Sequence, residues 1–401
     1  RYLKGLLLQK TGNFDDAAKV WKPLLTSHDR YHAVQAELAL VNNLFSRGEI
    51  LASEAIDRVE NIRFSWRGDS LEILILHRLG NLYIADQKYA AGLSILREAA
   101  TLSNKPDEQD RITMDMADTF SRLFVDKDAD QLSPVRALAI FNEFRELLPV
   151  GEAGNIALKN LAERLVRVDL LKQAGTLLDD LLHFRVKDKE AAEVGTRLAV
   201  VRLLDHEPKQ ALKALDESEN DFITEDLAQE RLLIRARALS DLGNVNQALE
   251  LLQQTESIAA KRLEVDINWR AGRWKAVAAI LEDIIDFELR NPIRGSREDM
   301  EQQQARVIDF VLKRGIALSL LERTDELKEL EEDYGALMEG SPYAAAFKVV
   351  VRPPQPGTLA DIQTLQERMA EIDLFHNFLK NYKIGQDNIA MAENLEEGEG
   401  E

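Results

Sequence analysis

Cysteine is absent from this 401-residue sequence. A chain without thiols forms no disulfide, has no cysteine nucleophile and cannot bind zinc or an iron–sulfur cluster through sulfur. Several classes of redox and metal protein are therefore excluded. The absence leaves the compartment open, with a slight preference for an oxidising one.

Positive charge is scarce as well, because 51 Lys and Arg residues face 70 Asp and Glu, giving a formal net charge of −19. A field of this sign repels the phosphates of nucleic acids and the anionic surface of membranes. The sequence also has no run of about 18 apolar residues, the length that a membrane-spanning helix requires. We therefore expect no nucleic-acid partner and no direct membrane insertion.

Aromatic residues make up 6% of the chain, and it has 20 Gly and 10 Pro, while 45% of its residues are hydrophobic. A low content of aromatic residues and of turn formers is more typical of Ala- and Leu-rich helices than of a strand-rich sandwich. The hydrophobic content is sufficient for a sizeable core. The composition predicts a folded, acidic, soluble all-α protein.

A repeat underlies the helical pattern. Four alanines stand 37 residues apart, each before a run of leucines: Ala137, Ala174, Ala211 and Ala248. Weaker members of the series are Ala17, Gly92 and Val277. Each unit consists of an amphipathic helix of about 14 residues, a short polar turn and a second amphipathic helix. The small residue allows the two helices to cross closely, and glycines such as Gly243 end the first helix in the left-handed conformation.

These residues resemble the tetratricopeptide repeat (TPR) family. The best unit matches the family pattern with Leu79, Gly80, Tyr83, Tyr89, Gly92, Leu96 and Ala99. The resemblance covers roughly residues 1–335, although the period of 37 exceeds the family's repeat of about 34 residues. It implies a right-handed α-solenoid of stacked antiparallel helix pairs. In the family's frame Arg1 falls inside a helix, so we expect a fragment of a longer bacterial TPR protein.

The breaks in the repeat predict the domain organisation. We expect a TPR-like solenoid of about eight helix pairs over 1–285 and an irregular charged linker over 286–306. A degenerate helix pair over 307–345 and a Pro-rich linker over 346–357 should follow. The acidic insertion around 125–131 is either a binding loop or a tolerated surface loop.

Two further segments are expected at the C-terminal end. Residues 358–382 carry a heptad-like apolar seam, which consists of Ile362, Leu365, Met369, Ile372, His376 and Leu379. This segment either caps the solenoid or pairs with another chain, which would allow self-association. Residues 383–401 are expected to be a disordered acidic tail.

Motifs that carry chemistry are missing. His28 and His32 have the i, i+4 spacing of metal ligands, but no third ligand is near in sequence, which favours a surface pair. There is no dinucleotide-binding, phosphate-binding or nucleophile-elbow motif. The tripeptide Arg67–Asp69 has the sequence of an adhesion motif but fits an ordinary turn between helices. We expect no enzyme, no metal and no cofactor.

The resemblance instead implies a binding groove along the first helix of each unit. Carried over residue by residue, the groove positions are His77, Asn81, Lys159, Glu163, Thr196, Arg237, Arg262, Asp266 and Trp269. Several of them are cationic in an acidic chain, which favours an acidic peptide or an acidic partner protein.

The expected function is therefore a non-enzymatic scaffold that binds a peptide or a partner protein along its concave surface. One alternative is a structural subunit of a larger envelope or motility-associated assembly. A hydrolase or metal enzyme is a remote second alternative. The style of the repeats suggests a bacterial protein, and a periplasmic location is slightly favoured over a cytoplasmic one.

Overall fold

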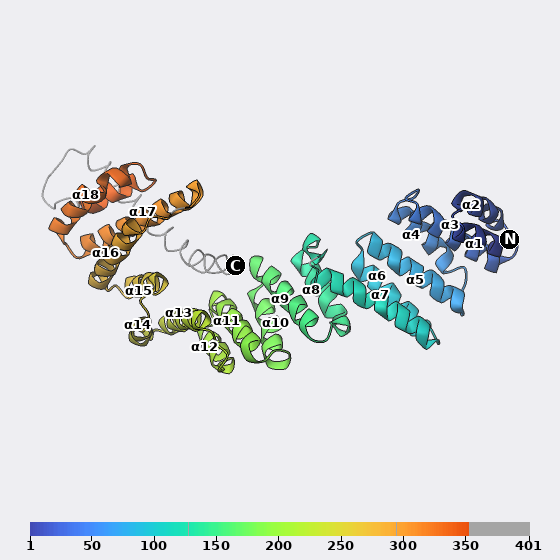
Figure 1. Cartoon of the computed structure of the whole chain (residues 1–401), viewed down its shortest axis with the longest axis horizontal. Helices are drawn as coiled ribbons and strands as arrows, with labels where there is room; N and C mark the ends of the chain where they lie inside the picture. Colours follow the sequence, from blue (N-terminus) through green and yellow to red (C-terminus); the bar gives the residue numbers. More distant parts are fainter. Residues whose placement is uncertain (127, 294, 353–401) are drawn as a thin grey trace, which may run out of the picture. The chain divides into compact units, whose positions relative to one another are not determined.

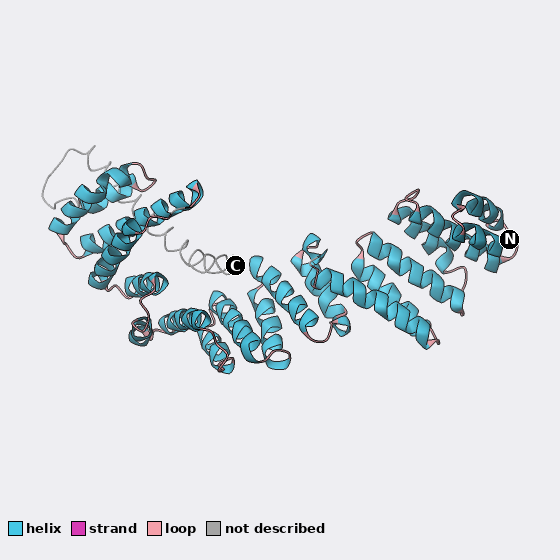
Figure 2. Cartoon of the chain, in the orientation of Figure 1, coloured by secondary structure: helices cyan, strands magenta, loops and turns pink. Residues whose placement is uncertain are grey.

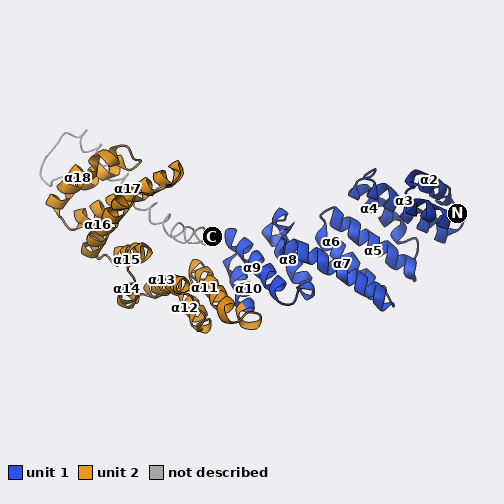
Figure 3. Ribbon diagram, viewed as in Figure 1, with its two compact units in different colours: residues 1–181 blue, residues 182–401 orange. Residues whose placement is uncertain are grey.

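The computed structural model describes residues 1–126, 128–293 and 295–352. These residues form nineteen α-helices, three short 3-10 helices and no strand (Figures 1 and 2). The all-α class is thus confirmed. The helices follow one another as pairs joined by tight turns, and the chain divides into two compact units, residues 1–181 and residues 182–401 (Figure 3). In each pair we call the N-terminal member the first helix and the other the second helix.

The first unit is a stack of five helix pairs. The pairs are α1 (Tyr2–Lys10) with α2 (Phe14–Trp21), α3 (Arg30–Ser46) with α4 (Ala52–Arg63), α5 (Ser70–Ala85) with α6 (Tyr89–Leu102), α7 (Pro106–Phe124) with α8 (Pro134–Glu143), and α9 (Glu152–Arg167) with α10 (Leu171–Phe184). The 3-10 helices are η1 (Lys22–Leu24), η2 (Asp128–Gln131) and η3 (Arg145–Leu147). First helices of successive pairs touch, as α1 touches α3 and α7 touches α9.

The second unit continues with four pairs and a final short helix. The pairs are α11 (Asp188–Leu204) with α12 (Pro208–Glu217), α13 (Glu225–Asp241) with α14 (Val245–Leu252), α15 (Ile258–Arg270) with α16 (Trp274–Arg290), and α17 (Arg297–Leu320) with α18 (Thr324–Glu339). The last helix, α19 (Ala344–Val351), packs on α17 and α18. Each unit is therefore an all-α solenoid of stacked helix pairs.

The small residues of the repeat lie at the helix crossings, as predicted. The four alanines in the 37-residue register, at positions 137, 174, 211 and 248, are all completely buried. The crossing of α5 and α6 is closer still, because a Cβ placed on Gly80 would lie 2.7 Å from the side chain of Leu96 and 3.0 Å from the carbonyl oxygen of Gly92. Two backbones at this separation leave no room for a side chain.

The turns inside the pairs also have the expected left-handed residue. Gly243 has a φ of 84°, and Gln87 and His206 adopt the same conformation with a φ of 58°. The backbone N–H groups that follow then bond to carbonyls in the last turn of the first helix, as Asn244 N does to Leu239 O at 2.9 Å. These bonds satisfy carbonyl groups that the end of a helix leaves open.

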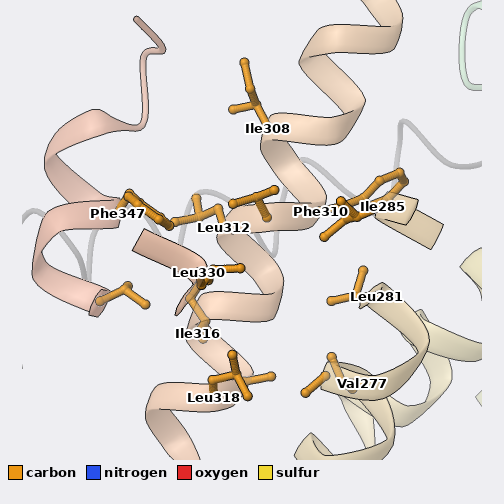
Figure 4. Packing of buried hydrophobic residues seen from close by; sticks show 14 of the residues in the cluster. Val277, Leu281, Ile285, Ile308, Phe310, Leu312, Ile316, Leu318, Leu330 and Phe347 are labelled. Carbon is orange, nitrogen blue, oxygen red and sulfur yellow. The ribbon is translucent and has the colours of Figure 1, made fainter. Parts of the chain in front are cut away.

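At the C-terminal end of the second unit, helices α15 to α19 share a continuous apolar core (Figure 4). Val277, Leu281 and Ile285 recur at intervals of four along α16 and form its buried face. They pack against buried residues of α17, while Leu330 of α18 and Phe347 of α19 complete the cluster. Burial of each such side chain contributes about 1.5–3 kcal/mol.

Side-chain amides fasten each of three pairs to the pair before it. Asn43 Nδ2 donates to the carbonyl oxygen of Phe14 at 3.3 Å, and Asn160 Nδ2 donates to that of Phe124 at 3.0 Å. Gln303 Nε2 donates to the carbonyl oxygen of Glu288, also at 3.0 Å. The bonded residues belong to α2, α7 and α16, and each amide belongs to the pair that follows. We call these three contacts the amide–carbonyl bonds.

The irregular linker expected over 286–306 is much shorter in the structure. Helix α16 continues to Arg290, and α17 begins at Arg297 and already forms the ninth pair before residue 307. The reason is a capping box at Ser296: its hydroxyl accepts from Asp299 N at 3.2 Å, and Asp299 Oδ2 accepts from Ser296 N at 2.6 Å. This reciprocal cap starts α17 despite the charged sequence around it.

The Pro-rich linker expected over 346–357 is likewise helical where it is described. Helix α19 runs to Val351, because Phe347, Val350 and Val351 bury their side chains. The segments 358–382 and 383–401, including the proposed self-association, lie outside the described residues.

The insertion around 125–131 is held against the rest of the first unit. Residues 128–131 form η2, in which Ala129 is buried. The Arg164 side chain of α9 donates to the carbonyl oxygen of Leu132 at 2.8 Å, and its Nε lies 3.0 Å from Asp130 Oδ1. The contacts of the described part of the insertion are therefore structural.

Candidate protein-binding face on the first helices

Two predicted groove residues, His77 and Asn81, lie one turn apart on α5 and face α7. His77 Nε2 lies 2.6 Å from Asp115 Oδ2, and Asn81 Nδ2 donates to the same oxygen at 3.4 Å. Asp115 was not predicted. The signal that marks it is its spacing of 38 residues from His77, close to one repeat, which places it at the corresponding level of the next first helix.

Arg78, the neighbour of His77 on α5, is the feature that the sequence argument missed. Its guanidinium carbon lies 5.4 Å from the centre of the Phe45 ring on α3. Its Nε is buried and has no hydrogen-bond partner, and no carboxylate of the described residues pairs with it. Burial lowers the pKa of Arg78 because it disfavours the charged form. The face formed by α3, α5 and α7 thus holds a partly buried cation without an anion.

An unpaired acceptor lies near this cation. Asn42 Oδ1 is buried and has no hydrogen-bond partner. Asn42 precedes Phe45 by three residues on α3, so the two side chains share one face of the helix. Since Arg78 stacks on Phe45, a donor group and an acceptor group at this face both lack a partner among the described residues. The sequence does single out Arg78: Glu72 and Arg78 are the two charged residues of the otherwise mostly apolar helix α5.

Two other predicted residues of the first unit, Lys159 and Glu163, lie one turn apart on α9 and are both partly buried. Helix α9 packs on α7. They therefore occupy a first helix, as the resemblance implied.

In the second unit the predicted groove charges neutralise one another. Arg237 on α13 donates through Nη1 to Asp266 on α15 at 3.0 Å and through Nε to Asp241 at 3.1 Å. Arg270 pairs with the same two carboxylates, at 3.2 Å from Asp241 and 3.4 Å from Asp266. We call these four residues the arginine–aspartate cluster. It joins two successive first helices, and its charges sum to zero.

Arg262 is paired in a similar way. Its Nη2 donates to Glu288 Oε1 at 2.7 Å, and its guanidinium carbon lies 5.6 Å from the centre of the Phe310 ring. Glu288 is almost fully buried and also accepts from Gln303 Nε2 at 3.0 Å. Arg262 thus fastens α15 to α16 and α17. An acidic ligand would have to compete with carboxylates already bound to Arg237 and Arg262.

The remaining two predicted residues of this unit contribute to packing. Trp269 meets Trp274 edge to face, with ring centres 5.2 Å apart at 87°, and it packs against the core of the unit. Thr196 does not face a groove, since it is 2% exposed.

The reason for the burial of Thr196 is Arg231, a residue that the sequence argument also missed. Arg231 is buried on α13, and its Nη1 donates to Thr196 Oγ1 and to Ser218 Oγ, each at 3.0 Å. Its Nη2 donates to the carbonyl oxygen of Leu215 at 2.6 Å and to Glu219 at 3.0 Å. A short hydroxyl side chain at position 196 is what this arrangement requires. We call these contacts the Arg231 network.

Motifs that resemble functional sites have structural roles. His32 Nδ1 lies 2.6 Å from Asp29 Oδ2, within one exposed turn. Asp69, the last residue of the adhesion-like tripeptide, caps α5 by accepting from Leu71 N at 2.8 Å. Within the described ranges no three His, Cys, Asp or Glu residues converge as metal ligands. No helix in this part of the chain is long and apolar enough to cross a bilayer.

The chain is similar to known proteins at low sequence identity. No protein-family model and no curated protein matches the sequence. Among solved structures, the chain is similar to one titled Naa15/Naa10 bound to HypK-THB, with 14% identity and a TM-score of 0.41. The match covers 87% of this chain and 54% of that one, so this chain spans about half the length of the chain it matches.

A second similar structure is the P58(IPK) TPR domain, with 12% identity, a TM-score of 0.25 and coverage of 87% of this chain and 95% of that one. The paired helices, the small residues at their crossings and the left-handed residues in their turns make this chain a TPR-like helical repeat protein.

Proposed function

We propose that this chain is a non-enzymatic scaffold and that the face formed by α3, α5 and α7 binds a segment of a partner protein. The observation that carries the proposal is Arg78, a partly buried arginine for which the described residues supply no carboxylate. A guanidinium has five N–H donors and stays charged at neutral pH. Within the described residues, this costly group therefore forms no ion pair that would stabilise the fold.

The contacts of Arg78 make up for little of the cost of its burial. A cation over an aromatic ring is worth about 0.5–2 kcal/mol, depending on its exposure, and the contact with Phe45 is of this kind. A hydrogen bond to a charged group contributes about 1.5–3 kcal/mol. A carboxylate from a partner would restore that contribution.

The chemistry of the partner follows from the guanidinium of Arg78. It is an extended or helical segment with an acidic side chain or a terminal carboxylate. The expectation of an acidic partner is thus retained, but its anchor moves from Arg237 and Arg262 to Arg78. The bacterial origin, the envelope location and the alternative of a structural subunit stay predictions.

Affinity capture with the full chain as bait tests the proposal. Proteins retained by the wild type and by Arg78→Gln would be quantified by mass spectrometry and compared. A genuine partner should be recovered at least tenfold less with Arg78→Gln, since about 1.4 kcal/mol corresponds to a factor of ten. Arg136→Gln is the matched control, because Arg136 is an exposed arginine on a second helix of the same unit. Equal recovery with both variants would contradict the proposal.

A further inference from the structure

The second unit has an apolar hollow that belongs to no groove position. It has a volume of about 610 Å³ and is lined by Gly272, Arg273, Trp274, Lys275, Ala276, Ala279 and Leu321. These residues come from the turn between α15 and α16, from the start of α16 and from the turn between α17 and α18. The floor is apolar, and Leu320 beside it is 55% exposed.

Two cations border this hollow without a carboxylate partner. Arg273 donates to the side-chain amide oxygen of Asn246 at 2.7 Å, and Lys275 is exposed. Neither residue forms an ion pair within the described part of the chain, in contrast to the arginines of the arginine–aspartate cluster. An apolar floor with a cationic rim matches a segment that carries apolar side chains between acidic ones.

The chain itself contains such a segment. Residues 387–401 have six acidic residues and no Lys or Arg, with Ile389, Met391 and Leu395 as their large apolar side chains. The seam over 358–382 fits the hollow less well, because its five apolar residues and His376 at heptad-like spacing require a surface several helical turns long, whereas seven residues bound the hollow.

The tether is long enough for the segment to reach the hollow. The 43 residues from Arg352 to Leu395 span up to about 140 Å when extended. Helix α16, with 17 residues, is about 26 Å long. Because the segment is part of the same chain, its effective concentration at the hollow is high, on the order of millimolar.

From these observations we infer that residues 387–397 dock in the hollow at the start of α16, with Leu395 or Met391 on the apolar floor and the glutamates against Arg273 and Lys275. This contact goes beyond the proposed function, because it uses residues of the second unit and involves no partner protein. It gives the chain a second recognition surface, one that accepts an acidic amphipathic segment.

Disulfide trapping in the full chain tests the docking, because the chain has no cysteine of its own. Cysteines introduced by Ala279→Cys and Asn394→Cys should form an intramolecular disulfide under mild oxidation, detected by mass spectrometry after digestion without reductant. The matched control combines Asn394→Cys with Ala228→Cys, at an exposed alanine of α13. We expect the first pair to react at least tenfold faster than the control.

The contribution of the two rim cations, Arg273 and Lys275, to docking is tested in the same assay. Adding Arg273→Glu and Lys275→Glu to the first pair should slow the reaction to the rate of the control pair, and an excess of a synthetic peptide with the sequence of residues 383–401 should slow it as well. Equal rates for the two cysteine pairs would overturn the docking. A predominance of disulfides between chains would assign the segment to a second copy instead. Insensitivity to the charge reversal would overturn the role of the rim. Circular dichroism of each variant establishes that it is folded.

Discussion

In the first unit, Arg78 is partly buried against Phe45, and no carboxylate of the described residues pairs with it. In the second unit, Arg231 and Arg237 instead donate hydrogen bonds to several acceptors of the chain. All three arginines lie on first helices. The Arg231 network and the arginine–aspartate cluster fasten successive pairs together, so their charges serve the fold. The charge of Arg78 has no such role within the described residues. A count of cations along a predicted groove therefore says little about binding until their internal partners are known.

The largest effect should come from breaking the Arg231 network. Arg231→Ala removes a side chain that is 5% exposed and leaves buried acceptors without a donor. We expect the free energy of unfolding to fall by about 3–5 kcal/mol, measured by urea denaturation followed by circular dichroism. Arg235→Ala is the control, because Arg235 is 32% exposed and pairs with Asp216 at the surface, where a loss below about 1 kcal/mol is expected. Similar losses for the two variants would show that the Arg231 network contributes no more to the free energy of unfolding than a surface ion pair does.

A close backbone crossing should matter next in the first unit. Gly80→Ala forces a methyl group to within 2.7 Å of Leu96, so we expect a loss of about 1–3 kcal/mol in the free energy of unfolding. Gly335→Ala is the contrasting variant on α18, where the nearest atom to a new Cβ is 3.9 Å away. It should gain about 0.5–1 kcal/mol, because alanine favours a helix interior over glycine. Changes of opposite sign in the free energy of unfolding, measured in the same denaturation assay, would confirm that the two glycines differ in the space around them. Changes of the same sign would contradict it.

Replacement of the two contrasted arginines by methionine tests the comparison directly. Arg78→Met keeps an unbranched side chain against Phe45 and removes an uncompensated charge, so stability should rise by about 1 kcal/mol. Arg237→Met leaves Asp241 and Asp266 with less compensation and should lower stability by about 1 kcal/mol. Thermal unfolding at neutral pH measures both. A loss of stability with Arg78→Met would mean that its charge has a partner within the chain.

The smallest effect concerns pH. Burial raises the pKa of the Glu264 carboxyl above its ordinary value of 4.5. The positive charge of Lys261 acts in the opposite direction and partly offsets this increase in pKa. Since the folded-state pKa is higher than the unfolded one, the stability that protonated Glu264 contributes is present below pH 4.5 and is lost as the pH rises through the folded pKa. Glu264→Gln should therefore flatten the decline of the melting temperature above pH 4.5, whereas Lys261→Gln should steepen it. An unchanged pH profile for Glu264→Gln would refute the assignment.

The features that the sequence predicted best are local or periodic. Ala174 and Ala211 lie at helix crossings, and Gly243 ends its helix, because a helix, its turn and the next helix are contiguous in the chain. The start of α17 was missed although Ser296 and Asp299 stand at capping-box spacing, since the surrounding charges suggested a linker.

The candidate site was predicted less well, for a different physical reason. Helical spacing gives the side of a helix on which His77 or Arg237 lies, but it does not reveal the partner. Asp266 is 29 residues from Arg237, and Thr196 is 35 residues from Arg231. Whether such a polar side chain is exposed or buried is decided by the neighbouring pair, so Thr196 was placed in the groove in error and Arg78 was not recognised.

The amide–carbonyl bonds of Asn43, Asn160 and Gln303 have a consequence for the way in which the solenoid unfolds. Each donor lies in one pair and each acceptor in the pair before it, so loss of one pair leaves a carbonyl of its neighbour without that donor. Because the stability of a stacked array is the sum of intrinsic and nearest-neighbour terms, such bonds add to the coupling between neighbours. Amide hydrogen exchange should then show the joined pairs opening together, as α16 and α17 across Gln303, rather than helix by helix.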